Sequence, residues 1–265
     1  MNHRDLRLVN FERMEAWPAA LLRARGNASV RALRAARWVL RRKADGRYLA
    51  TLDADGKLYA LLPPALARAR RQLHPAELSG HLHQIERQAR PAPMPSHALR
   101  EHCVRLGLDA GYSQRHGLPL VPEPSWLALA DFDRWQRPLW LLPQAAAGWR
   151  RMQAAAAADG VRLEAISGYR SHAYQLGIFR RKLARGQTLA QILSVNAAPG
   201  YSEHHSGRAL DIGTPGQPPA EESFEATPAF AWLCENAAAF GFHLSYPRDN
   251  PHGIVYEPWH WCLRT

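Results

Sequence analysis

Two short stretches far apart in the sequence carry side chains that together could hold a metal ion. Ser202–Asp211 reads Ser-Glu-His-His-Ser-Gly-Arg-Ala-Leu-Asp, and Glu257–His260 reads Glu-Pro-Trp-His. Two imidazoles and one carboxylate, from His204, Asp211 and His260, would leave the fourth position of a tetrahedral zinc ion open, as in catalytic sites. Each spacing taken alone is common, and a core histidine or a turn acid is the simpler interpretation of each. Only together do the residues predict one catalytic Zn²⁺.

A carboxylate for proton transfer lies beside these candidate ligands. Glu257 precedes His260 by three residues, an offset that would put the two side chains on opposite faces of a straight strand. Pro258 disfavours a regular strand, so we expect a bend that turns Glu257 toward the metal. Glu257 would take a proton from zinc-bound water as that water attacks a carbonyl, and would then pass it to the leaving amine.

The elements that must position these residues are predicted to form an α+β fold, a small antiparallel sheet flanked by helices. Ala-rich and amphipathic patterns predict helices, and β-prone runs predict strands. The expected helices are 143–159, 174–185, 188–195 and 227–240, and the expected strands are 161–166, 209–212, 242–246 and 255–262.

The N-terminal part has a different pattern. A helical pattern covers 11–42, and two β-prone runs around Asp53-Ala-Asp-Gly56 predict a hairpin. A second helix is expected over 65–88. The proline-rich stretch Arg90–Ser96 is the best linker candidate. We therefore predict a mostly helical accessory domain with a β-hairpin at 1–95, followed by a second domain at 96–265 that carries the chemistry.

Charge separates the same two parts. Residues 1–100 contain 19 Lys and Arg against 8 Asp and Glu, whereas 101–265 contain 15 of each. A basic N-terminal part favours an anionic partner, such as an anionic envelope polymer or nucleic acid, or it is simply a solvated face. No nucleic-acid-binding motif is recognisable, so a nucleic-acid partner is not expected.

Cysteines and hydropathy give few further constraints. Three cysteines without CxxC spacing predict free thiols rather than a disulfide framework. No run of about eighteen apolar residues predicts a transmembrane helix, and the first residues do not resemble a secretory signal.

Four motifs in this order make the chain resemble the LAS zinc metallopeptidases, and among them the VanY-like D-alanyl-D-alanine carboxypeptidases. They cover roughly residues 126–265. The residues that carry the resemblance are Ser167–Ser171 with Gln175, Pro199–His204 with Gly207, Ala209 and Asp211, Gly241–Pro247, and Glu257–Trp261.

The resemblance implies a role for each matching position. His204, Asp211 and His260 would bind zinc, and Glu257 would be the catalytic base. Arg170 would bind the carboxylate of the substrate or the oxyanion that forms on attack, because its permanent charge and planar fork suit either. Four further residues would line the substrate site, namely Gln175, Ser202, Tyr201 and Tyr246, although core packing is an equal expectation for the two tyrosines.

We therefore expect a zinc-dependent carboxypeptidase that hydrolyses the terminal D-Ala-D-Ala bond of peptidoglycan stem peptides. One alternative is a peptidoglycan endopeptidase of the same zinc class, a lytic enzyme with L,D or D,D cleavage. Another is a hedgehog-like zinc-binding module without catalysis, against which the presence of Glu257 argues. The substrate class places the protein in the cell envelope or periplasm, and the lack of a visible signal leaves a cytoplasmic location open.

Overall fold

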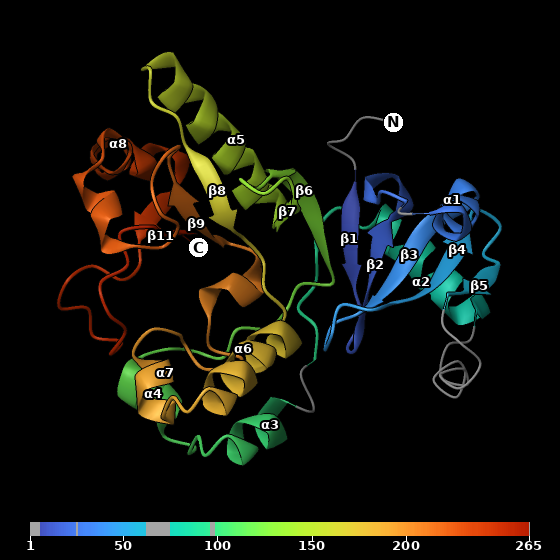
Figure 1. Cartoon of the computed structure of the whole chain (residues 1–265), viewed down its shortest axis with the longest axis horizontal. Helices are drawn as coiled ribbons and strands as arrows, with labels where there is room; N and C mark the ends of the chain where they lie inside the picture. Colours follow the sequence, from blue (N-terminus) through green and yellow to red (C-terminus); the bar gives the residue numbers. More distant parts are fainter. Residues whose placement is uncertain (1–5, 25, 62–74, 96–98, 265) are drawn as a thin grey trace.

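The computed structural model describes residues 6–24, 26–61, 75–95 and 99–264. The part described contains two antiparallel sheets with helices packed around them (Figure 1). One sheet has seven strands in the order β5-β4-β3-β2-β1-β6-β7, and the other has four in the order β10-β11-β9-β8. The α+β class and the antiparallel pairing predicted for the chain are confirmed. In this part of the chain, no helix is both long and apolar enough to cross a bilayer.

The N-terminal part is built mainly of strands, so the predictions of a helix over 11–42 and of a mostly helical domain are wrong. β1 (Arg7–Asn10), β2 (Met14–Pro18) and β3 (Ala36–Arg42) lie side by side. Between β2 and β3 the chain forms the short 3-10 helix η2 (Ala19–Leu21) and the helix α1 (Asn27–Arg34). The apolar run Trp38–Leu40 is buried. A short apolar run of this kind fits a buried strand as well as one face of a helix, and the pairing of β3 with both β2 and β4 decides for the strand.

The predicted hairpin is confirmed as β4 (Tyr48–Asp53) and β5 (Leu58–Ala60). Gly56 adopts a left-handed φ of 81° in the turn, and Asp53 Oδ1 accepts hydrogen bonds from the N–H groups of Asp55 and Lys57. The helix predicted over 65–88 is observed as α2 (Pro75–Arg87), whereas residues 65–74 lie outside the described part. Three side chains of α2 at helical spacing pack into the core of the seven-stranded sheet: Leu78, Leu82 and Ile85.

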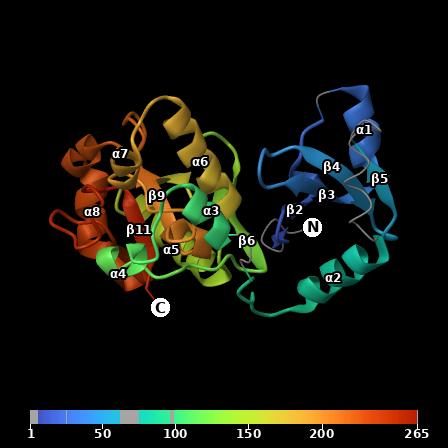
Figure 2. The same ribbon diagram turned by 90° about the horizontal axis from the view of Figure 1, so that it is seen from below.

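The seven-stranded sheet continues across the domain boundary predicted at residue 95. β6 (Trp126–Phe132) pairs with β1 through the register Leu8↔Leu127, and β7 (Pro138–Leu141) extends the edge. In Figures 1 and 2, β1–β5 with α1 and α2 lie on one side of the molecule, and the four-stranded sheet with its helices lies on the other. The two parts of the chain are therefore joined by a shared sheet as well as by the segment between them.

The four-stranded sheet carries most of the residues of interest. β9 (Ala209–Gly213) and β11 (His260–Leu263) are neighbours, with β8 (Glu164–Ser167) and β10 (Phe242–Leu244) at the edges. The long helix α5 (Pro143–Ala158) packs on this sheet through the fully buried Trp149. The remaining helices are α3 (Leu99–Arg105), α4 (Tyr112–His116), α6 (His172–Ala184), α7 (Leu189–Leu193) and α8 (Pro228–Asn236). Cys103, Cys234 and Cys262 are free thiols, as predicted.

Burial of His172 at the start of α6 predicts a pH dependence of stability. Burial lowers the pKa of this imidazole from 6.5, and the charge of Glu123 opposes that effect only in part. Below pH 6.5 the unfolded chain therefore binds a proton that the folded protein does not, so the free energy of unfolding falls as the pH drops from 7 toward the folded pKa. His172→Gln removes this contribution. Urea unfolding of the variant should depend less on pH between 7 and 5 than unfolding of the parent protein.

The matched control is His83→Gln on α2, because His83 is exposed. Its unfolding free energy should follow that of the parent at every pH. A pH dependence of His172→Gln equal to that of the parent would contradict the burial argument. Each unit of pKa difference between the folded and unfolded states corresponds to about 1.4 kcal/mol.

Candidate metal centre

Three buried side chains from three elements converge on one point. His204 lies on the 3-10 turn η4 (Glu203–Ser206), Asp211 on β9 and His260 on β11, and their donor atoms all lie within 4.8 Å of one another. Asp211 and His260 are direct cross-strand partners, which fixes their separation. Gly207 ends the turn that carries His204, and only glycine fits well there. Its φ is 69°, and a Cβ at this position would lie 2.4 Å from Leu127 Cδ2.

The hydrogen bonds of His204 leave one nitrogen available to a cation. Its Nδ1 lies 2.7 Å from the carbonyl oxygen of Gly168, so Nδ1 carries the proton and donates. Its Nε2 is buried, lies 3.3 Å from Asp211 Oδ1 and makes no hydrogen bond of good geometry within the described residues. Burial lowers the pKa of His204 to about 4, so the ring is neutral at pH 7. A neutral imidazole with an unused buried nitrogen fits a metal ligand.

His260 is oriented by Glu203, a residue that the sequence did not single out. The Nε2 atom of His260 lies 2.8 Å from Glu203 Oε2. Its Nδ1 atom lies 3.2 Å from Asp211 Oδ1 and therefore faces the other two candidate ligands. Burial would lower the pKa of His260, but Asp211 and Glu203 outweigh it and raise that pKa to about 10. In turn burial would raise the pKa of Glu203, but His260 holds it at about 2. A cation bound at Nδ1 would displace a proton from this ring.

A carboxylate beside a ligand histidine is the usual second partner of that ring. The sequence alone does not assign such a partner to either histidine. Glu203 directly precedes His204, yet it serves His260, which lies 57 positions later. Glu203 can be assigned to His260 only once the pairing of β9 with β11 is known, because this pairing brings the two residues together.

Glu203→Gln should therefore weaken metal binding although all three ligand residues are kept. The amide cannot accept from Nε2–H with the strength of a carboxylate, so His260 loses both orientation and basicity. We expect zinc affinity, measured by competition with a chelating dye, to fall about 10- to 100-fold. Glu221→Gln, at an exposed acid, should bind zinc like the parent. Equal affinity of the Glu203→Gln variant would show that this carboxylate does not support the ligand.

Glu257, the residue predicted to be the base, lies beside the cluster of His204, Asp211 and His260. The chain turns between Glu257 and His260, with the His260 N–H donating to the Glu257 carbonyl at 3.1 Å, which is the bend predicted around Pro258. Glu257 Oε2 lies 3.8 Å from His260 Nδ1. Burial is the main cause that raises its pKa to about 7, and the charge of Asp211 adds to it, although His260 opposes the effect. A carboxyl group with a pKa near neutrality suits proton transfer in both directions.

Arg170 and three of the other predicted substrate residues border the same narrow cavity of about 30 Å³. The cavity is lined by Arg170, Gln175, Ser202, Tyr246, Glu257 and His260, among others. The Arg170 guanidinium lies 3.2 Å from Asp211 Oδ2, and its buried Nε makes no hydrogen bond within the described residues. The side-chain amide N–H of Gln175 donates to the Ala197 carbonyl. The side-chain oxygen of Gln175 accepts no hydrogen bond within the described residues. These groups are free to contact a bound molecule.

Tyr201 does not line this cavity. It packs against Tyr112 with ring centroids 5.0 Å apart and borders a neighbouring hollow of about 820 Å³, to which Glu203 and Tyr246 also contribute. His205 is fully buried and lies within hydrogen-bonding distance of the Arg170 carbonyl, at 2.6 Å. Trp261, the residue after His260, packs in the core.

Comparison with known proteins identifies the family. Residues 139–264 match the VanY family, described as D-alanyl-D-alanine carboxypeptidase. The chain is 34% identical over 157 residues to the putative carboxypeptidase YodJ of Bacillus subtilis (strain 168). This match covers 56% of each protein. It therefore spans only about half the length of that relative. It is 32% identical over 154 residues to the bifunctional D-Ala-D-Ala dipeptidase and carboxypeptidase VanXYC of Enterococcus gallinarum, covering 56% of this chain and 78% of the relative.

Among solved structures, the LD-carboxypeptidase LdcB is similar, with a TM-score of 0.50 and 31% identity over 55% of this chain and 71% of LdcB. The matched region contains the three candidate ligands, Glu257 and Arg170, but none of β1–β5. The chain therefore belongs to the VanY family of D-alanyl-D-alanine carboxypeptidases.

Proposed function

We propose that the protein is a zinc-dependent carboxypeptidase that removes the terminal D-alanine from peptidoglycan stem peptides. The observation that carries this proposal is the meeting of five side chains at one place. His204, His260, Glu257 and Arg170 line one cavity, and Asp211 clusters with the two histidines. Two imidazoles and one carboxylate form a donor set that suits Zn²⁺. The family and the name of VanXYC point to the same chemistry.

In the proposed mechanism, each residue of the cavity has one task. A zinc ion held by the three ligands supplies Lewis-acid chemistry. Glu257 takes a proton on its carboxylate from the attacking water and then delivers that proton to the amine of the leaving residue. The fixed positive charge of Arg170 binds the terminal carboxylate of the peptide, or the oxyanion that forms on attack. Gln175 and Ser202 contribute polar contacts to the walls, and we propose the same for Tyr246.

The experiment that tests this proposal is product analysis on defined stem peptides. A pentapeptide that ends in D-Ala-D-Ala should lose one D-alanine, detected by mass spectrometry, and the same peptide with a C-terminal amide should be a poor substrate because Arg170 has no carboxylate to bind. A cross-linked dimer cut internally, with no free D-alanine released, would show an endopeptidase instead. Unchanged peptides in the presence of bound zinc would favour a binding module.

The similarity to LdcB supports a second candidate, cleavage of an L,D bond, because that relative is named an LD-carboxypeptidase. The same assay separates the two. A D,D-enzyme stops at the tetrapeptide, whereas an L,D-enzyme shortens a tetrapeptide to a tripeptide. In either case we propose that the protein acts at the cell wall, because its proposed substrate is a wall component.

The basic N-terminal part suggests an additional anionic partner in the envelope. We propose that this partner is a wall polymer rather than nucleic acid. Binding to an anionic glycan but not to DNA in moderate salt would support the proposal, and the opposite preference would contradict it.

A further inference from the structure

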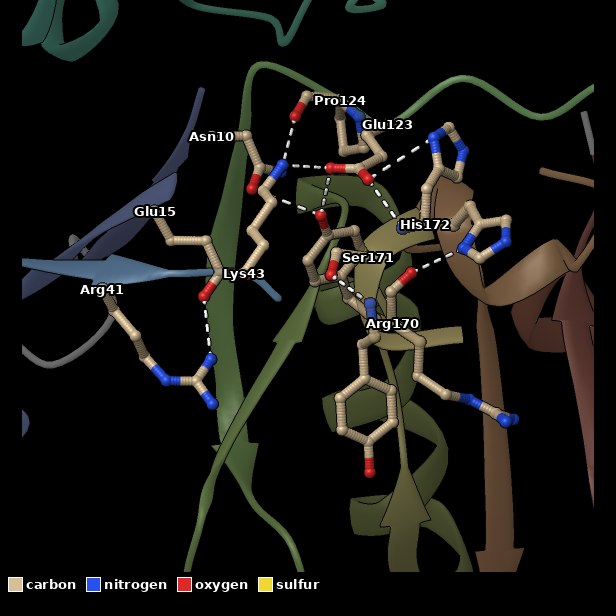
Figure 3. A network of polar contacts seen from close by, with 12 residues as sticks. Asn10, Glu15, Arg41, Lys43, Glu123, Pro124, Arg170, Ser171 and His172 are labelled. Atoms are coloured by element: carbon tan, nitrogen blue, oxygen red, sulfur yellow. Dashed lines mark hydrogen bonds and ion pairs between the residues drawn. The ribbon is translucent and has the colours of Figure 1, made fainter. Parts of the chain in front are cut away.

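A buried ion pair connects the strands β1–β5 of the seven-stranded sheet, called the N-terminal sheet below, to the segment that carries Arg170. Lys43 follows β3 directly, and its ammonium pairs with the carboxylate of Glu123. The side chain of Lys43 is 1% exposed and that of Glu123 is 8% exposed. Figure 3 shows Lys43 reaching from the N-terminal strands to Glu123, which lies next to His172. Both residues of the pair lie outside the region that matches the VanY family.

Glu123 binds the residues on both sides of Arg170. Its carboxylate lies 2.7 Å from the Tyr169 hydroxyl, and it accepts the backbone N–H of His172, also at 2.7 Å. Burial would raise the pKa of Glu123, but the charges of Lys43 and His172 outweigh it and hold that pKa below 4.5. The carboxylate is therefore ionised at pH 7, the state in which it accepts these hydrogen bonds most strongly.

The partners of Glu123 are themselves fixed by the N-terminal sheet. The backbone N–H of Lys43 donates to the Arg13 carbonyl, and the Asn10 side chain donates to the Pro124 carbonyl at 2.8 Å. Asn10 Oδ1 also lies 3.2 Å from the Tyr169 hydroxyl. The position of Tyr169 and His172 is thus set from β1 and from the end of β3.

Between these two anchors, Arg170 projects into the catalytic cavity. Its backbone N–H donates to the His204 carbonyl at 3.2 Å, and its carbonyl accepts from His205. Among the described residues, its guanidinium is held by Asp211, at 3.2 Å. A shift of the backbone at 169–172 would move the guanidinium relative to a bound carboxylate, and misplacements of about 1 Å can cost about 100-fold in rate.

We propose that Lys43 and Glu123 are positioning residues that hold Arg170 in place for recognition of the substrate carboxylate. The N-terminal sheet is then a working part of the peptidase rather than an independent accessory unit. This inference rests on the proposed role of Arg170 and adds to it residues that the family match does not include.

The test is a double-mutant cycle between Lys43 and Arg170 in the full-length, zinc-loaded protein. Lys43→Met leaves Glu123 buried without its cation, so we expect KM for a pentapeptide to rise about tenfold or more, while kcat and zinc content change little. In the Arg170→Met background the same substitution should have no further effect on KM, because Lys43 acts only through Arg170. Cleavage of the amidated peptide should be equally slow in all these proteins.

Arg42→Met is the matched control, because Arg42 is the preceding residue and forms a partly exposed pair with Asp45. It should leave KM unchanged. If Lys43→Met does not fold, Tyr169→Phe removes only the hydroxyl beside Glu123 and should give the same pattern with a smaller rise in KM.

The outcomes separate the two proposals. A normal KM in both Lys43→Met and Tyr169→Phe, or an equal rise in KM with and without Arg170, would overturn the positioning role while leaving the carboxypeptidase proposal intact. An Arg170→Met protein with a normal KM for the pentapeptide would overturn the recognition role of Arg170, and the positioning role with it.

Discussion

Replacing Glu257 with glutamine is expected to reduce kcat by about 10²- to 10⁴-fold while zinc remains bound. The amide has nearly the same shape as the carboxyl group but cannot take up and release a proton. Glu257 is not one of the three clustered donors, so the metal should be retained. Steady-state release of D-alanine, together with metal analysis of the same sample, measures both quantities.

Folding stability distinguishes this loss from damage to the fold. Because burial raises the pKa of Glu257 to about 7, the charged form is less favourable in the folded protein than in the unfolded chain. Glutamine removes that charge, so the free energy of unfolding at pH 8 should stay the same or increase. Glu225→Gln, at an exposed acid, should retain full activity. An active Glu257→Gln enzyme would exclude Glu257 as the base.

The sequence predicted the C-terminal part well because its signals are local. Pro143 begins α5 and Thr227 caps α8, with the Thr227 side chain accepting from the Phe230 N–H, so short-range chemistry fixes these boundaries. The ligand set could also be proposed, since His204 and Asp211 are close in sequence and resemble a family motif. For these residues the structure adds the strand register, which places Asp211 directly opposite His260.

The sequence-based predictions were wrong or missing where pairing between distant segments determines the structure. The run around Val39 fits a helix face until β2 and β4 supply hydrogen bonds on both sides. Glu203 acts on His260, and Lys43 acts on Glu123, across 57 and 80 positions respectively. No periodicity or spacing in the sequence contains such partners, so neither the orientation of His260 nor the link from the N-terminal sheet could be predicted.

Removing one ligand is expected to abolish both metal-dependent stability and activity. His204→Ala deletes the buried Nε2 that has no other hydrogen-bond partner in the described part of the chain, and leaves two donors, Asp211 and His260. A ligand at 1,000 times its Kd stabilises a folded protein by about 4 kcal/mol. For a chain of this size, zinc should therefore raise the Tm of the parent protein by roughly 10 °C, and the Tm of His204→Ala by far less.

Chelation completes this test. Treatment with a chelator should bring the parent protein down to the Tm and the inactivity of His204→Ala, and added zinc should restore the parent alone. His83→Ala, at an exposed histidine on α2, controls for the loss of an imidazole and should show the full zinc-dependent shift. Because stability is measured without substrate, a zinc response in His204→Ala equal to that of the parent would locate the metal elsewhere, even if catalysis were lost. A parent protein that stays active after complete removal of metal would instead contradict the zinc mechanism.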